Sequence, residues 1–125
     1  GARRAEPTSL AIVSLRDGQP AYQFYREGTA ERMVTLDALE SASGGRGVAA
    51  MHLGSLALTG GADADAWAEF YCRVSEGGAL ASLDPNIRPA FIGDTDEFMS
   101  RLDRVLQRTD VLKLSDEDLQ WLDPS

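Results

Sequence analysis

Three short apolar segments alternate with helix-like segments in the second part of the chain, and this alternation restricts the fold more than any other feature. The apolar segments are Val48 to Leu53, Ala79 to Leu83 and Asp110 to Leu114. They are short, apolar on both faces and separated by segments of helical periodicity. Strands joined in this way form parallel sheets with right-handed crossovers, so we expect an α/β fold with adjacent parallel strands.

The segments that follow these strands have the periodicity of amphipathic helices. Apolar side chains recur at steps of three and four residues from Asp63 to Glu76 and from Asp94 to Gln107. Asp94 and Glu97 have the spacing of a capping box, and Ser115 is placed to cap a third helix that runs through Leu122. These helices complete the strand-helix alternation.

The N-terminal part has a different pattern, that of a β-hairpin. Thr8 to Leu15 is a continuous β-prone run, Asp17-Gly18 supplies a turn, and Ala21 to Tyr25 alternates apolar and polar residues. A short helical stretch begins near Thr35 and ends at the Gly44-Gly45 pair. We therefore expect residues 1–30 to form a hairpin of an edge layer and residues 31–125 to form a partial α/β core.

Charge and composition exclude several classes of protein. The net charge is −8, from 20 acidic and 12 basic side chains, so a nucleic-acid partner is not expected. No apolar run approaches the roughly 20 residues of a membrane span, and no secretory signal is evident. Cys72 is the single cysteine, which fits a reducing, cytoplasmic location. With one histidine, His52, it leaves no soft-ligand metal site.

Polar residues follow the predicted strands at the edge where open parallel sheets bind ligands. The three strand exits are Gly54-Ser55-Leu56, Asp84 to Arg88 and Lys113-Leu114-Ser115. Asn86 and Arg88 occupy alternate positions, so both can face one side, and their amide and guanidinium suit a polyhydroxylated or phosphorylated ligand. An Asx-type turn at Asp84, with Arg88 paired to a surface carboxylate, explains the spacing equally well.

Five segments match, in chain order, motifs of a known enzyme family. They are Thr8 to Ala11, Phe24 to Ala30, Gly54 to Leu56, Asp84 to Pro89 (D-x-N-x-R) and Lys113 to Leu119. Together they resemble the ribokinase-like (PfkB-type) carbohydrate kinases, in particular the fructokinase and 2-keto-3-deoxygluconate kinase branch. The resemblance implies the central part of a three-layer α/β/α fold, incomplete here, with the hairpin in a lid-like β-layer.

The resemblance also implies substrate-binding residues. Phe24, Tyr25 and Arg26 would contact the sugar or sugar acid, and Asn86 and Arg88 would reach the substrate or the transferring phosphate. For Arg26 the alternative is a solvated charge at the end of a hairpin.

A second group is implied on the phosphate and nucleotide side, namely Asp84, Lys113, Ser115 and Asp118. The family usually has glutamate at the position of Asp118, so its contact with Mg²⁺ would pass through water. The alternative for Ser115 and Asp118 is a capping box.

Two glycine-rich segments are not assigned a catalytic role. The stretch from Gly45 to Ala50 fits G-x-G-x-x-A but precedes a strand, so it is no dinucleotide loop. The stretch from Thr59 to Asp63 resembles the family's catalytic D-T-x-G-A-G-D only superficially, because the glycine order differs and it precedes the D-x-N-x-R segment. We expect Asp63 to be a helix N-cap, and the catalytic aspartate to lie outside these residues.

The resemblance thus implies an intact parent that uses ATP and Mg²⁺ to phosphorylate a primary hydroxyl of fructose or a related ketose, while this chain alone would be inactive. The alternatives are a 2-keto-3-deoxygluconate kinase and a non-catalytic kinase remnant or dimerising module. A homodimer through the hairpin layer is expected for the intact protein.

Overall fold

The computed structural model describes residues 3–44 and 47–124, and the chain divides into two compact units. Unit 1 is Gly1–Val34 and unit 2 is Thr35–Ser125.

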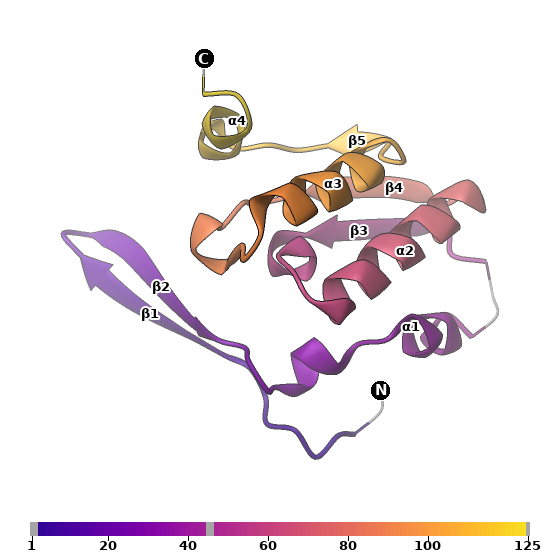
Figure 1. Cartoon of the computed structure of the whole chain (residues 1–125), viewed down its shortest axis with the longest axis horizontal. Helices are drawn as coiled ribbons and strands as arrows, with labels where there is room; N and C mark the ends of the chain where they lie inside the picture. Colours follow the sequence, from indigo (N-terminus) through magenta and orange to yellow (C-terminus); the bar gives the residue numbers. More distant parts are fainter. Residues whose placement is uncertain (1–2, 45–46, 125) are drawn as a thin grey trace. The chain divides into compact units, whose positions relative to one another are not determined.

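Unit 1 is built on an antiparallel hairpin (Figure 1). Strand β1 (Leu10–Arg16) pairs with β2 (Gln19–Tyr25), from Leu10 opposite Tyr25 to Arg16 opposite Gln19. The two connecting residues, Asp17 and Gly18, have φ of 52° and 79°. Positive φ at both central positions is the pattern of the type I′ turn, whose twist matches that of paired strands. The predicted hairpin is confirmed, and a single 3₁₀ turn (η1, Ala30–Met33) follows it.

Unit 2 contains a parallel sheet of three strands in the order β3-β4-β5. The strands are β3 (Ala50–Gly54), β4 (Leu80–Asp84) and β5 (Val111–Leu112). Its helices are α1 (Leu36–Ala42), α2 (Ala62–Glu76), α3 (Thr95–Leu106) and α4 (Asp116–Leu122), with 3₁₀ turns η2 (Ser55–Leu58) and η3 (Pro89–Phe91). The predicted α/β alternation and parallel pairing are confirmed.

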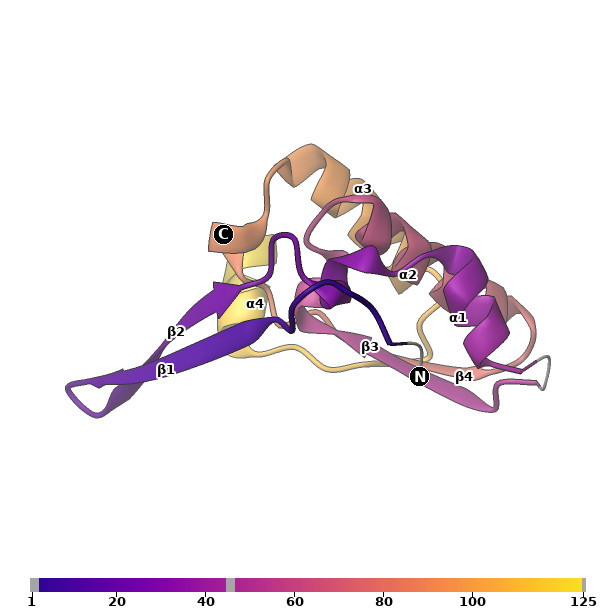
Figure 2. The same ribbon diagram turned by 90° about the horizontal axis from the view of Figure 1, so that it is seen from below.

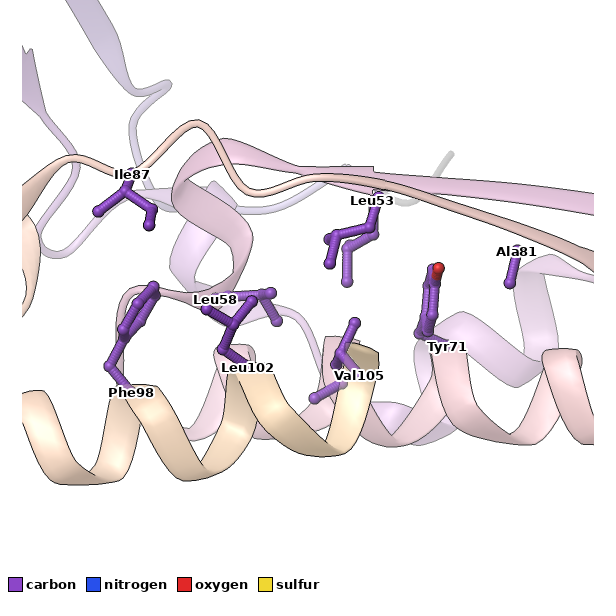
Figure 3. Packing of buried hydrophobic residues seen from close by; sticks show 10 residues of the cluster. Leu53, Leu58, Tyr71, Ala81, Ile87, Phe98, Leu102 and Val105 are labelled. Carbon is purple, nitrogen blue, oxygen red and sulfur yellow. The ribbon is translucent and has the colours of Figure 1, made fainter. Parts of the chain in front are cut away.

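Helices α2 and α3 pack side by side on one face of this sheet (Figures 1 and 2). The core lies between the two layers, where side chains from the strands, the helices, the η2 turn and the segment after β4 meet (Figure 3). Its buried members are Leu53, Leu58, Ala68, Tyr71, Ala81, Leu83, Ile87, Phe98, Leu102 and Val105. Each large apolar side chain buried here contributes roughly 1.5–3 kcal/mol, which fixes both helices against the strands.

Burial alternates along β4, which corrects the expectation that the strands are buried on both faces. Ala81 and Leu83 face the helices and are fully buried, whereas Leu80 is 54% exposed. In the edge strand β5, Val111 and Leu112 are 51% and 44% exposed. The apolar sequence of these strands is typical of a sheet covered on both faces, and in this chain α2 and α3 cover one.

Of the N-caps predicted for α2 and α3, the one for α3 is confirmed and the one for α2 is not. Asp94 caps α3 as predicted, with its carboxylate accepting a hydrogen bond from the N–H of Glu97 at 3.0 Å. The prediction that Asp63 caps α2 is wrong. Gly61, with φ of 88°, is the N-cap, and Asp63 lies buried in the first turn. Glycine adopts this conformation without the steric cost of a side chain, so the helix begins earlier.

Helix α1 ends at Ala42, with Ser43 as C-cap and Gly44 in the left-handed region. Gly45, predicted to end this helix, and Arg46, within the excluded G-x-G-x-x-A stretch, lie outside the described residues. None of the helices in residues 3–44 and 47–124 has the length and apolar character needed to cross a membrane.

Candidate functional site

The ends of β4 and β5 bring two of the three predicted polar segments together. The backbone N–H of Lys113 donates to the carbonyl of Leu83 at 2.9 Å, which extends the pairing beyond β5. The Nζ of Lys113 lies 2.8 Å from Oδ2 of Asp84, so the two side chains form an ion pair at this edge. Because parallel strands end at the same edge, these sequence-distant residues become neighbours.

The first strand exit reaches the same edge through a close backbone approach. Gly54 pairs with Asp84, and a Cβ at Gly54 would lie 2.7 Å from the backbone oxygen of Asp84. A separation this short excludes any side chain without a shift of the strand. The glycine at this position therefore lets β3 run against the end of β4.

Asp118 connects α4 to the end of β4. Its Oδ2 accepts hydrogen bonds from the N–H of Ser115 at 3.0 Å and from its hydroxyl at 2.8 Å. The hydroxyl of Ser115 in turn accepts from the N–H of Asp118 at 3.1 Å, which completes a capping box. Oδ1 accepts from the backbone N–H of Ile87 at 2.6 Å. The side chain thus fastens two strand exits to each other.

The electrostatics of Asp118 follow from these contacts. Burial of the carboxyl group, which is 2% exposed, opposes ionisation. The hydrogen bonds from Ser115 and Ile87, with the positive charge of Arg88, outweigh burial and lower the pKa of Asp118 below its ordinary value. Asp118 is therefore an ionised, internally satisfied carboxylate at neutral pH.

The hydrogen bonds of Asp118 bear on its predicted contact with Mg²⁺. Both carboxylate oxygens already accept hydrogen bonds within the chain. In the described part of the chain no three His, Cys, Asp or Glu side chains gather closely enough to hold a metal ion. These residues do not by themselves form a metal site, and the capping box is the structural role that the geometry supports for Ser115 and Asp118.

Asp84 presents a second carboxylate with a different environment. Oδ2 pairs with Lys113, while Oδ1 is buried and has no hydrogen-bond partner in the described structure. A buried acceptor of this kind favours a donor such as a hydroxyl and disfavours an anion. Lys113 supplies the positive charge of this ion pair, and Asp84 holds its ammonium group in place.

Asn86 and Arg88 follow on the same segment, and both are half-buried. Asn86 has φ of 40°, a conformation that asparagine adopts more readily than most residues and that fits the local-turn interpretation. The Nη1 of Arg88 donates to the carbonyl of Ile87 at 3.1 Å. Its positive charge contributes to the lowered pKa of Asp118. Their predicted contact with substrate stays a prediction.

The third group of predicted residues, Phe24, Tyr25 and Arg26, lies in unit 1 at the end of β2. A hollow of about 410 Å³ is lined by these three and by Pro7, Thr8, Leu10, Glu27 and Thr29. Arg26 is 7% exposed, so the alternative of a solvated charge is wrong. Its Nε donates to Oε1 of Glu31 at 2.6 Å, and its carbonyl accepts from the hydroxyl of Thr29 at 2.5 Å.

Glu31 is a site residue that sequence reasoning missed. Partial burial opposes its ionisation, but hydrogen bonds from Arg26 and Ser9, with the charges of Arg26 and Arg32, lower the pKa of its carboxyl. The available signal was an acidic residue five positions after Arg26, beyond a glycine at position 28 that turns the chain back.

The chain is similar to known fructokinases. The chain is 39% identical over 115 residues to a fructokinase of Rhizobium leguminosarum bv. trifolii and 33% identical over 116 residues to fructokinase-1 of Zea mays. Each match covers 92% of this chain, but 34% and 36% of the respective relative. No family model matches the chain.

Solved structures show the same relation. A crystal structure of fructokinase with bound ATP from Xylella fastidiosa superposes with a TM-score of 0.80 at 31% identity, covering 98% of this chain and 37% of that one. A putative ribokinase II from E. coli, at 24% identity and a TM-score of 0.79, shares the fold. The chain therefore has part of the ribokinase-like α/β fold, and its resemblance to the ribokinase-like carbohydrate kinases is confirmed over a segment that spans about a third of the fructokinases it matches.

Proposed function

We propose that this chain is part of an ATP-dependent sugar kinase that phosphorylates a primary hydroxyl of fructose or a related ketose. The observation that carries the proposal is the 39% identity to a fructokinase over 92% of the chain. The paired Asp84 and Lys113 at the ends of adjacent strands support it, because a parallel sheet binds ligands at this edge.

The described residues of this chain can supply positive charge and positioning for phosphoryl transfer, and none of them is assigned as the catalytic base. Phosphoryl transfer depends on positioning and on cations that offset charge developing on the phosphoryl oxygens. Lys113 and Arg88 supply positive charge at the strand ends, and Asp84 orients Lys113. Asp118 holds the backbone at Ile87 and positions the segment that carries Asn86 and Arg88. The segments described here include no assigned catalytic base, so the activity is proposed for the longer protein.

The substrate side is assigned to the hollow in unit 1. Phe24 and Tyr25 offer apolar ring surface, and Arg26 offers a guanidinium, a combination that suits a sugar ring with its hydroxyls. ATP would be the phosphoryl donor, as the bound nucleotide of the Xylella fastidiosa enzyme suggests. Mg²⁺ is proposed to accompany the nucleotide, since phosphoryl transfer generally uses it to offset the charge of the phosphates.

The test is turnover by the protein expressed with its natural flanks. ADP release is measured with ATP and fructose, and separately with ATP and 2-keto-3-deoxygluconate. Lys113→Met should raise KM for ATP or lower kcat, whereas Arg108→Met, a surface arginine in an ion pair with Glu76, should leave both within about twofold. Absence of turnover with every ketose and sugar acid tried would remove the enzymatic proposal.

A second candidate is a non-catalytic kinase remnant or a module that dimerises through its hairpin. The observation that favours dimerisation is the exposed apolar surface of β1, where Leu10, Ile12, Val13 and Leu15 are 60%, 49%, 55% and 74% exposed. We propose a homodimer through this layer for the longer protein, with a cytoplasmic location in keeping with the single cysteine. Sedimentation of the wild type against Ile12→Lys tests the dimer, which the lysine should weaken. A monomeric wild type would rule the dimer out.

A further inference from the structure

An ion pair between a buried arginine and a partly exposed glutamate lies beside the hollow in unit 1. Arg26 is 7% exposed, and both its Nε and its Nη2 lie 2.6 Å from Oε1 of Glu31. Two guanidinium nitrogens directed at one carboxylate oxygen make a short, charge-assisted contact in a partly desolvated setting. Glu31 therefore offsets positive charge that Arg26 would otherwise present to a ligand.

A second ion pair, between Arg32 and Glu27, lies close to the first. Nε of Arg32 lies 3.8 Å from Oε1 of Glu27, and the charge of Arg32 acts on Glu31 as well. The two arginines and two glutamates sum to zero formal charge. The residues that line the hollow include four apolar or aromatic ones, Pro7, Leu10, Phe24 and Tyr25.

We infer that Glu31 is a specificity-determining residue that neutralises Arg26 and thereby makes the hairpin hollow select a neutral ketose over a sugar acid; this rests on the proposed function. An unpaired buried arginine attracts a substrate carboxylate strongly. Here a second carboxylate would approach an arginine that Glu31 already holds, and it would meet the like charge of Glu31 in a partly buried site. A hydroxyl carries no such penalty and accepts from or donates to the pair.

The experiment uses the protein with its natural flanks and compares kcat/KM for fructose and for 2-keto-3-deoxygluconate. Glu31→Gln removes the compensating charge, so the ratio of the two values should shift at least tenfold toward the sugar acid, equal to about 1.4 kcal/mol. Glu31→Asp keeps the charge and should keep the preference of the wild type. Glu76→Gln is the matched control, because Glu76 lies outside the hollow and its ion pair with Arg108 is on the surface.

Three outcomes are informative. An equal loss with both substrates in Glu31→Gln means that the residue is merely structural, which overturns the inference. If that variant does not fold, the double variant Arg26→Gln/Glu31→Gln is uncharged and should still discriminate against the sugar acid; a gain of sugar-acid turnover in it contradicts the reasoning. A measurement on the wild type does not depend on whether a variant folds. The inhibition constant of the sugar acid against fructose phosphorylation should be at least tenfold above the KM for fructose. Equal values overturn the inference.

Failure of the underlying function is distinguishable from failure of the inference. A wild type without turnover on either substrate refutes the kinase proposal. Calorimetric titration of that protein with fructose and with gluconate then decides the charge argument by itself. Tighter binding of gluconate than of fructose contradicts it, and the reverse order supports it.

Discussion

Replacing Asp118 by asparagine should destabilise the chain strongly, although it exchanges only one carboxylate oxygen for an NH₂ group. The carboxylate is 2% exposed and accepts from the N–H of Ile87 at 2.6 Å and from the N–H and hydroxyl of Ser115 at 3.0 and 2.8 Å. Asparagine offers one acceptor oxygen, so its NH₂ group must face at least one of these donors. A buried donor left without a partner costs about 1–3 kcal/mol, and loss of the cap costs about 1 kcal/mol. We expect a loss of about 2–4 kcal/mol in the free energy of unfolding.

The assay is urea denaturation followed by circular dichroism, with Asp116→Asn as the matched control. Asp116 is the first residue of the same helix and is exposed, so its charge lies at the positive end of the helix dipole. That interaction is worth about 0.3–1 kcal/mol. Equal midpoints for the two variants would refute the assignment of Asp118 as the residue that ties α4 to β4.

The pH dependence of this effect has a defined sign. The pKa of Asp118 is lower in the folded chain than its ordinary value of 3.8. Its contribution to stability is therefore complete above pH 3.8 and disappears as the pH falls through the lower folded pKa. The difference between the wild type and Asp118→Asn should shrink in acid, and a constant difference from neutral pH to pH 2 would contradict the ionised, hydrogen-bonded state.

Three further substitutions test the packing that positions the site. Gly54→Ala should cost about 1–3 kcal/mol through the clash with the β4 backbone, whereas Gly93→Ala, with nothing within 4 Å of the new Cβ, should cost less than about 0.5 kcal/mol; similar midpoints in urea would contradict the close approach. Leu102→Ala, at a position 1% exposed, should lower the free energy of unfolding by about 2–5 kcal/mol, and a loss under 1 kcal/mol would place it outside the core. Tyr71→Phe removes the 2.9 Å hydrogen bond to Thr109 and should cost about 0.5–1.5 kcal/mol in thermal melts; a stabilised variant would be inconsistent with that bond.

Local signals in the sequence predicted the elements well. The Asp17-Gly18 turn, the strand-helix alternation and the Asp94 cap all depend on residues adjacent in the chain, and the structure contains each of them. The prediction that Asp63 caps α2 was wrong because several residues of types that can cap a helix precede the helix, among them Thr59, Gly60 and Gly61. The sequence does not state which of them adopts the special conformation, and the backbone of Gly61 decides it.

The site was harder to predict because its contacts are long-range. From spacing alone, Ser115 and Asp118 could be a capping box or a phosphate-side pair. The contact between Asp118 and Ile87, 31 positions away, could not be predicted from that spacing. The Arg26–Glu31 pair spans a loop that carries no periodic pattern. Apolar content likewise predicted the strands of the sheet but not which face α2 and α3 would cover, since that depends on elements far along the chain.

The short turn between β1 and β2 has an effect beyond the hairpin tip. Its two residues set the register that places Leu10 opposite Tyr25. Side chains alternate between faces along a strand, so a slip of one position would send every side chain of β2 to the opposite face. The orientation of Phe24 and Tyr25, which lead into Arg26, thus depends on the turn at the other end of the hairpin, and a one-residue insertion in that turn would change the lining of the hollow at the end of β2.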